Sequence, residues 1–229
     1  MPIGDELKTT TVALARRPAR SFRLERCPVL DNRDYTLIVD RSGSMSTQDR
    51  EKNQSRWNSV RDSALALASK CEELDPDGIT VYLFSSTFRR YDNVTTAKVA
   101  QIFEENQPVG RTNLAEVLQD AFANFFDRRQ KGETKPNGET MLVITDGEPD
   151  DRKAVMKEIV KASRQIDRDE ELAVSFIQVG TDPKVTEYLK ALDDNLVDAG
   201  AKFDIVDTID IDTMKNRPLA DVLLDAIID

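Results

Sequence analysis

Tyr35-Thr-Leu-Ile-Val-Asp-Arg-Ser-Gly-Ser-Met45 is the stretch of sequence from which the fold of this chain can be inferred. Its first five residues, 35–39, are apolar or favour β-structure, which predicts a short buried strand at the centre of a sheet. Asp40, Ser42 and Ser44 then follow at alternate positions, so one loop can aim three oxygen-bearing side chains at one point. Carboxylate and hydroxyl oxygens are hard ligands, which suit Mg²⁺, Mn²⁺ or Ca²⁺ better than zinc.

The same loop also has an explanation that needs no ligand. Gly43 lets the backbone turn tightly between the two serines. A Ser- and Gly-rich turn whose Asp40 caps the next helix would have the same residues. This stretch alone leaves the two interpretations open, and the rest of the chain has to decide between them.

Apolar periodicity predicts strands that alternate with helices along the chain. Further strands are expected at 79–84, 140–145, 172–179 and 202–206, with an edge strand at 88–94. Helices are expected at 57–74, 96–105, 114–125, 155–166, 183–197 and 218–228, and the polar stretch 46–56 is expected to be a loop. This alternation implies an α/β, doubly wound fold with a mostly parallel central sheet, helices on both faces and one antiparallel edge strand.

Oxygen-bearing residues recur where ligands bind in such folds, beyond the carboxyl ends of the strands. Asp146 ends the expected strand 140–145, and Thr112 lies in a loop that enters a helix. Four further acids are expected on the same face as solvated or helix-start charges: Asp49, Glu148, Asp150 and Asp151. Cys71 falls on the apolar face of its helix, which indicates packing.

Composition excludes several classes of function. The 229 residues contain no histidine and only two cysteines, so Ser-His-Asp and Cys-His centres and His-ligated zinc are excluded. The net charge of −10 argues against general nucleic-acid binding. No apolar run approaches the roughly 20 residues that cross a membrane, and the N-terminus lacks the layout of a signal peptide. A cytoplasmic location is therefore expected.

Residues 1–34 differ from the rest of the chain in charge. Seven Lys and Arg residues face five Asp and Glu residues there, which gives a net charge of +2. Five arginines form a local basic arm: Arg16, Arg17, Arg20, Arg23 and Arg26. We expect this extension to pack on the acidic body of the protein, 35–229, although the arm could instead dock on a partner.

The order of the motifs resembles a known family. Asp-x-Ser-x-Ser at 40–44, Gly-x-Thr at 110–112 and Thr-Asp-Gly at 145–147 are similar to the metal-ion-dependent adhesion site of von Willebrand factor A (VWA) domains. The resemblance covers the chain from about residue 35 to the C-terminus. It implies that Ser42 and Ser44 bind the metal through their hydroxyls and that Thr112 binds directly or through water. Asp40 and Asp146 would act mainly through water or through hydrogen bonds.

This resemblance implies a metal-dependent protein-binding module rather than an enzyme. An acidic residue of a partner would complete the coordination of Mg²⁺, Mn²⁺ or Ca²⁺. Soluble bacterial VWA proteins of this kind act as scaffold subunits, beside AAA+ ATPases or in stress-response complexes, and such partners are expected here. The alternative is a metal-dependent hydrolase or phosphatase on a similar sheet. Phosphatases of that kind carry a second Asp where this chain has Ser42, and no Gly-x-x-x-x-Gly-Lys loop is present.

Overall fold

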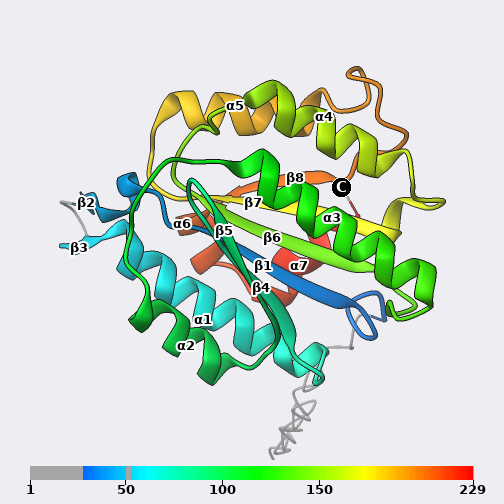
Figure 1. Cartoon of the computed structure of the whole chain (residues 1–229), viewed down its shortest axis with the longest axis horizontal. Coiled ribbons are helices and arrows are strands. Elements are labelled where there is room, and N and C mark those ends of the chain that lie inside the picture. Colours follow the sequence, from blue (N-terminus) through cyan, green and yellow to red (C-terminus); the bar gives the residue numbers. More distant parts are fainter. Residues whose placement is uncertain (1–27, 50–52, 229) are drawn as a thin grey trace, which may run out of the picture.

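A six-stranded sheet forms the centre of the computed structural model, which describes residues 28–49 and 53–228. The strand order is β5-β4-β1-β6-β7-β8 (Figure 1). The strands are β1 (Asp34–Asp40), β4 (Ile79–Phe84), β5 (Phe88–Val94), β6 (Glu139–Thr145), β7 (Leu172–Gln178) and β8 (Val206–Asp210). β5 pairs antiparallel with β4, and the other neighbours are parallel. The predicted α/β fold with one antiparallel edge strand is confirmed.

Helices cover both faces of the sheet, as the alternating pattern predicted (Figure 1). One face carries α1 (Arg56–Leu74), α2 (Thr96–Glu105), α6 (Ile211–Lys215) and α7 (Leu219–Asp225). The other carries α3 (Leu114–Lys131), α4 (Arg152–Ser163) and α5 (Pro183–Asp194). Two short 3₁₀ turns, η1 (Gly43–Ser46) and η2 (Asp169–Glu171), complete the described helical segments.

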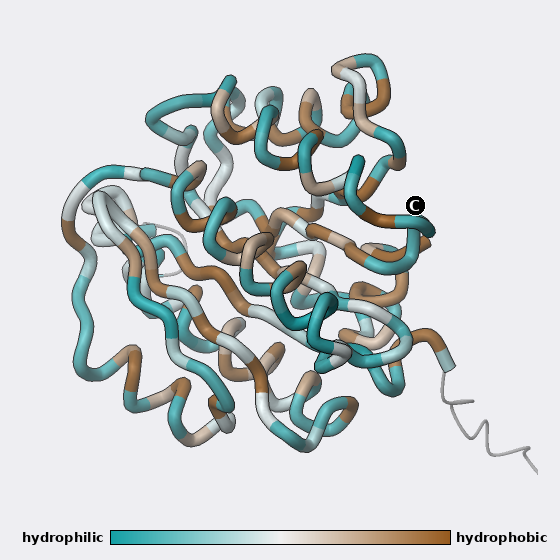
Figure 2. Tube along the Cα trace, turned by 45° about the vertical axis from the view of Figure 1, so that its right-hand side comes forward, coloured by the Kyte–Doolittle hydropathy of each residue, from teal (hydrophilic) through white to brown (hydrophobic). Residues whose placement is uncertain are grey.

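β1 belongs to both cores because successive side chains of a strand point to opposite faces. Leu37 and Val39 pack with the α1 side, whereas Ile38 packs with the α3 side. Thr36 is paired with Thr80 of β4 and with Met141 of β6, so β1 is bordered on both sides. Figure 2 shows the hydrophobic strands running through the interior between more polar helices. The first motif therefore follows a strand that is packed on both faces and bordered on both edges.

The last strand lies later in the chain than expected. The prediction of a strand at 202–206 was wrong, since β8 begins at Val206. The hydroxyl of Ser163 accepts hydrogen bonds from the backbone amides of Lys202 and Phe203, at 2.8 and 3.0 Å, and donates to the Phe203 carbonyl at 3.0 Å. Bonds to α4 thus take the place of bonds to a neighbouring strand. The edge position of β8 also tolerates Asp207 and Asp210, which hid it from the apolar pattern.

Smaller differences concern segments with weak apolar patterns. The expected loop 46–56 contains a short hairpin of β2 (Gln48–Asp49) and β3 (Gln54–Ser55), and α1 begins at Arg56. α5 ends at Asp194 rather than near 197, and α6 had not been predicted. None of the helices in the described part of the chain has both the length and the apolar character needed to span a bilayer.

The described end of the N-terminal extension, 28–34, lies against the entrance to β6. The Asn137 side chain donates to the carbonyls of Pro28 and Asp31, at 2.8 and 2.6 Å. Leu30 is buried in the α1-side core, and Arg33 is fully buried. Residues 1–27, which include the five arginines of the basic arm, lie outside the described part of the chain.

Candidate metal centre

The first motif lies in a loop that is tied to a second loop at the carboxyl end of the sheet. β1 ends at Asp40, and the chain then turns into η1. The Gly43 amide donates to the Gly110 carbonyl at 3.0 Å, and the Val109 amide donates to the Arg41 carbonyl at 2.7 Å. These bonds hold the serine-containing loop against the loop that carries Thr112.

A chain of three side-chain oxygens joins the first motif to the third. The hydroxyls of Ser42 and Ser44 lie 2.9 Å apart, and Ser44 donates to Asp146 Oδ1 at 2.7 Å. Asp146 follows β6 directly, and β6 is the neighbour of β1 in the sheet. The parallel register therefore brings together residues that are 102 positions apart in sequence.

Asp40 holds the serine loop that carries this chain of oxygens. Its side chain is fully buried, Oδ1 accepts from the Ser42 amide at 2.7 Å, and Oδ2 accepts from the Thr145 hydroxyl at 2.7 Å. Burial raises the pKa of Asp40 to about 6, although both hydrogen bonds favour the carboxylate. Asp40 thus fixes the backbone of the serine loop and links it to the end of β6.

Thr112 lies beside the turn that follows Asp146. Its carbonyl accepts from the Asp150 amide at 2.9 Å, and its hydroxyl oxygen is 3.9 Å from the place where a Cβ on Gly147 would stand. Its side chain is mostly buried. The structure therefore brings all five predicted residues to one edge of the sheet, and Thr112 lies outside the hydrogen-bond chain from Ser42 to Asp146.

Arg56 is a member of this cluster that sequence analysis missed. Its Nη1 donates to Asp146 Oδ2 at 2.8 Å, while the Asp146 side chain is fully buried. Gly180, at the end of β7, leaves room for the guanidinium, because a Cβ there would lie 3.1 Å from Arg56 Nη2. A basic residue in the first turn of a helix opposes the helix dipole. That unfavourable position of Arg56 was the one feature of the sequence that could have indicated a specific role for it.

The donor set fits a small divalent cation. Mg²⁺–oxygen bonds of 2.0–2.1 Å place adjacent ligands of an octahedron about 2.9 Å apart. The Ser42–Ser44 and Ser44–Asp146 oxygen separations of 2.9 and 2.7 Å are close to that value. Within the described residues, no three Asp, Glu or Cys side chains gather into a metal-binding group, so a cation here would depend on hydroxyl ligands. Neutral hydroxyls leave such an ion partly uncompensated in charge.

Comparison with known proteins identifies the fold. The family model described as von Willebrand factor type A domain matches residues 35–148, which include all three motifs. The chain has a VWA fold. No protein with a curated description matches the sequence.

Solved structures agree with the VWA fold at low sequence identity. The chain is similar to the PilB minor pilin from Streptococcus sanguinis, at 16% identity and a TM-score of 0.55, over 85% of this chain and 62% of that one. A mutant of the same pilin has 14% identity and a TM-score of 0.59, over 86% of this chain and 63% of that one. This chain thus spans less than two thirds of either pilin chain. Manganese-loaded TRAP protein from Plasmodium vivax has 14% identity and a TM-score of 0.51, over 80% of this chain and 70% of that one.

The further acidic residues predicted on this face make contacts within the chain. Asp151 caps α4 by accepting from the amides of Lys153 and Ala154, at 3.0 and 2.9 Å, as its helix-start position predicted. Glu148 forms an ion pair with Arg152, and Asp150 lies 3.8 Å from Arg111. Asp49 is in β2. These contacts favour a role in shaping the face over a role as ligands.

Proposed function

We propose that this VWA domain is a protein–protein interaction module that binds one divalent cation, Mg²⁺ or alternatively Mn²⁺ or Ca²⁺. The ion would be held by Asp40, Ser42, Ser44, Thr112 and Asp146. The observation that carries the proposal is the Ser42–Ser44–Asp146 oxygen chain, which brings two hydroxyl oxygens and a carboxylate oxygen from two separate loops to one point. Further support comes from TRAP protein, a fold relative that has been solved with manganese.

The chemistry of the cluster favours a ligand that carries an anionic oxygen. A bound cation supplies a local positive charge and an exchangeable coordination position. The hydroxyls of Ser42, Ser44 and Thr112 are neutral ligands, and Asp40 and Asp146, acting mainly through water or hydrogen bonds, neutralise a divalent ion only in part. Ser44, on the exposed side of the loop, leaves the position open to solvent. An Asp or Glu of a partner protein can then replace a water at that position.

The hydrolase or phosphatase alternative is less well supported. A phosphoryl-accepting aspartate has to present a free carboxylate oxygen to its substrate. Asp40 is fully buried, and each of its two carboxylate oxygens already accepts a hydrogen bond. Asp146 is engaged by Ser44 and Arg56 in the same way. Both carboxylates are thus arranged to hold other groups rather than to attack a substrate.

Thermal unfolding with and without Mg²⁺ tests the metal site. A ligand at about 100 times its dissociation constant stabilises the folded state by roughly 2.7 kcal/mol, which corresponds to a shift of about 5–10 °C for a chain of this size. Ser44→Ala should lose most of this shift. The matched control is Ser46→Ala, an exposed hydroxyl in the same turn, which should keep it. Equal melting of wild type and Ser44→Ala at saturating metal would refute the proposed site.

The partner side of the proposal needs a second experiment. Affinity purification in Mg²⁺, repeated in chelator, should recover a protein only when the ion is present, and Thr112→Ala should weaken that recovery. Recovery that is unchanged by chelator and by Thr112→Ala would show that this face is not the binding surface.

The predicted partner is still an AAA+ ATPase or a stress-response complex. A cytoplasmic location is still a prediction, which cell fractionation can check.

A further inference from the structure

A second surface of the VWA domain, the α4–α5 groove, has the properties of a binding site. It is a hollow of about 860 Å³ between α4 and α5. Its floor is apolar and includes Met156, Val160 and Leu192. Val160 and Leu192 are only 7% and 1% exposed, so the floor lies below the surrounding surface. None of the five proposed metal ligands lines it.

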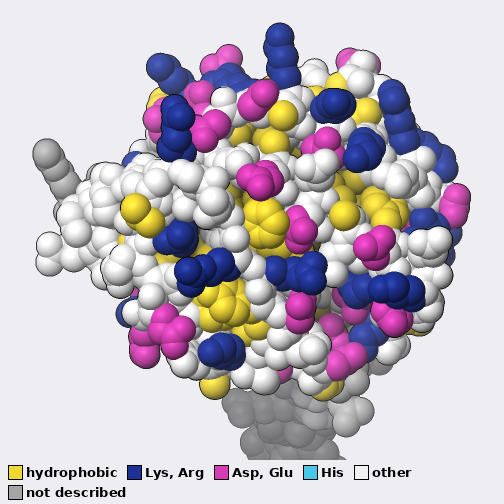
Figure 3. Space-filling view, in the orientation of Figure 1, with side chains coloured by type: hydrophobic (Ala, Val, Ile, Leu, Met, Phe, Trp, Pro, Cys, Tyr) yellow, Lys and Arg dark blue, Asp and Glu magenta, His cyan; other side chains and the backbone are white. Residues whose placement is uncertain are grey.

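The rim of the α4–α5 groove is basic. Lys153, Lys157 and Lys161 are spaced four residues apart on α4, so they form one row along the helix. Arg152 and Arg164 mark the two ends of the adjacent row. These five cations surround one groove of a chain whose net charge is −10. In the space-filling view, Lys and Arg side chains gather around hydrophobic atoms in the region of α4 (Figure 3).

Some of this positive charge is not neutralised within the chain. Arg152 is paired with Glu148, and Lys161 lies 3.4 Å from Glu158. Lys153 and Lys157 are exposed, and neither forms an ion pair with another described residue. The middle of the basic row is therefore available to a ligand with negative charge.

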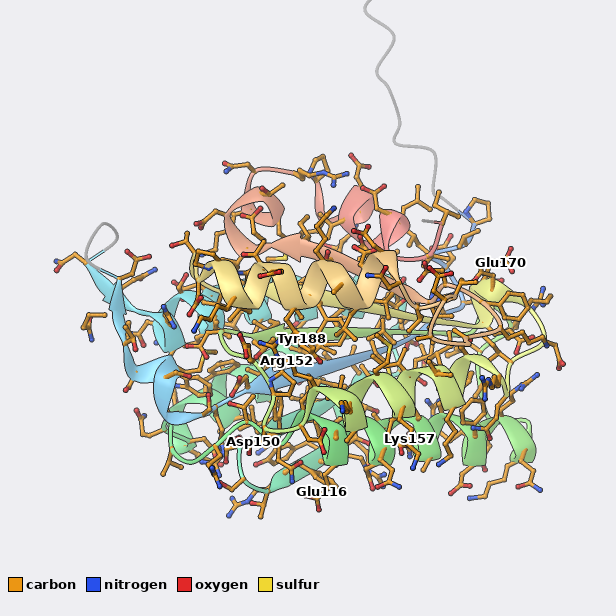
Figure 4. All side chains as sticks on the ribbon, turned by 90° about the horizontal axis from the view of Figure 1, so that it is seen from above. Glu116, Asp150, Arg152, Lys157, Glu170 and Tyr188 are labelled. Carbon is orange, nitrogen blue, oxygen red and sulfur yellow. The ribbon has the colours of Figure 1, made fainter. Side chains whose placement is uncertain are left out.

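Tyr188 supplies a polar group at the floor of the groove. Its side chain is 6% exposed, and its hydroxyl has no hydrogen-bond partner among the described residues. The Arg152 guanidinium lies 5.1 Å from the centre of its ring, and the two side chains come from facing helices (Figure 4). Leaving a buried hydroxyl without a partner is unfavourable. What Tyr188 offers a ligand in the groove is its aromatic ring, which Arg152 covers.

We propose that the α4–α5 groove binds an acidic, amphipathic segment of a partner protein. The apolar face of the segment would cover Met156, Val160 and Leu192, and its Asp and Glu side chains would face Lys153 and Lys157. Such a helix-in-groove arrangement joins an apolar anchor to electrostatic complementarity. The proposal does not depend on the metal site, because the two surfaces share no residue.

Other occupants fit less well. The N-terminal arm of this chain carries five arginines, which the basic rim would repel. A symmetric pair of identical chains with its two-fold axis through the groove would bring two basic rims together, because a patch on the axis meets its own copy. A flat bilayer could reach the lysines but not the recessed floor, since Val160 and Leu192 are buried. An acidic segment that enters the groove meets none of these obstacles.

Fluorescence anisotropy with the full chain tests the proposal with three labelled peptides of about 14 residues, four helical turns. The first has Leu and Glu at amphipathic spacing, the second has the same composition scrambled, and the third replaces Glu with Lys. We expect the first to bind most tightly. The groove variant Lys153→Glu/Lys157→Glu/Lys161→Glu should weaken its binding by about tenfold or more, because attraction becomes repulsion.

A matched variant separates the groove from overall charge. Lys131→Glu/Lys184→Glu/Lys190→Glu changes the net charge equally at exposed positions outside the groove. It should alter binding by no more than about twofold. A milder groove variant, Lys153→Gln/Lys157→Gln/Lys161→Gln, should bind at an intermediate level, and circular dichroism should confirm that each variant is folded. Ser44→Ala should bind like wild type, which keeps this test separate from that of the metal site.

Several outcomes would overturn the proposal. Equal binding of the amphipathic and scrambled peptides, or equal loss in the two glutamate variants, would leave only non-specific charge attraction. Sedimentation that changes from dimer to monomer in the groove variant would assign the groove to a second copy of the chain. Binding to vesicles of phosphatidylserine and phosphatidylcholine, without binding to the acidic peptide, would assign it to a membrane surface.

Discussion

The two ends of strand β6 carry carboxylates with almost the same first partners. At the amino end, Glu139 accepts from the Thr36 hydroxyl at 2.6 Å and pairs with Arg128. At the carboxyl end, Asp146 accepts from the Ser44 hydroxyl at 2.7 Å and pairs with Arg56 at 2.8 Å. Both carboxylate side chains are buried, and the two arginine side chains are equally exposed, at 24% and 25%.

The difference lies in what supports each hydroxyl and each arginine. Thr36 is buried inside β1, and Arg128 also pairs with Asp34 at 2.7 Å, so the amino-end network is closed. Ser44 is exposed in a short turn, and within the described part of the chain Arg56 forms an ion pair with Asp146 alone. A buried carboxylate is therefore structural when its donors are buried or are held by a second partner. It can become a ligand when solvent or an ion can replace those donors.

The largest loss of stability should follow from breaking the Arg128 network at the amino end of β6. Arg128→Met removes the partner of both Glu139 and Asp34. Breaking a buried ion pair typically costs about 3–5 kcal/mol, so the free energy of unfolding should fall by that amount, with or without Mg²⁺. Urea denaturation measures the loss. Arg61→Met is the control, since its pair with Asp62 is exposed and should contribute little. A loss that Mg²⁺ restores would contradict the distinction between the two ends.

A pH effect at the amino end should be smaller. Burial, with the neighbouring Asp77 carboxylate, raises the pKa of Asp75 to about 7. An aspartate of raised pKa binds a proton more readily in the folded state, so its stabilisation is complete below about pH 4 and is lost as the pH rises through 7. Asp75→Asn, which resembles the protonated acid, should therefore gain about 1–2 kcal/mol relative to wild type between pH 5 and pH 8.

Urea denaturation of both proteins at the two pH values gives this difference directly. The pKa of Asp77 is lowered to about 2, first by its hydrogen bond with Asp75 and then by Lys135, so the comparison reports on the Asp75–Asp77 pair as a unit. Identical changes in wild type and Asp75→Asn would show that Asp75 is already ionised at pH 5.

The smallest effect should sharpen the comparison at the open end. The positively charged guanidinium of Arg56 contacts Asp146, close to the proposed cation position. Arg56→Gln should therefore raise the affinity for Mg²⁺ about three- to tenfold, because a competing charge is removed. Isothermal titration calorimetry measures the affinity. Arg41→Gln is the matched control, since this arginine lies in the serine loop and donates instead to the Gln107 carbonyl. Weaker Mg²⁺ binding by Arg56→Gln would mean that Arg56 supports the site.

Local sequence signals predicted most of the fold. The strands at 79–84 and 88–94 and the helix at 96–105 have the bounds that the structure gives them, since turn residues and apolar periodicity mark both ends. The predicted start of β8 was too early because the backbone amides of Lys202 and Phe203 donate to the Ser163 hydroxyl, 39 or 40 residues earlier, instead of to a neighbouring strand. A bond of that kind depends on how α4 packs, which no local pattern encodes.

The candidate site was predictable in its residue types and not in its contacts. The motif around Asp40 and the turn after β6 are visible as sequence, and the parallel strands explain why they meet. Arg56 was missed because its pairing with Asp146 spans 90 residues. The α4–α5 groove was equally hidden, since Met156 and Leu192 read as ordinary apolar helix positions until the two helices are placed side by side.

The central position of β1 also sets when the site can assemble during protein synthesis. Ser44 leaves the ribosome early, but its partner Asp146 is made 102 residues later. At about 5–20 residues per second, that interval lasts roughly 5–20 seconds. Throughout it, β1 lacks β6, one of the two strands that border it. The nascent chain therefore exposes an apolar strand for seconds, and the proposed cation site cannot form before β6 has been made and pairs with β1.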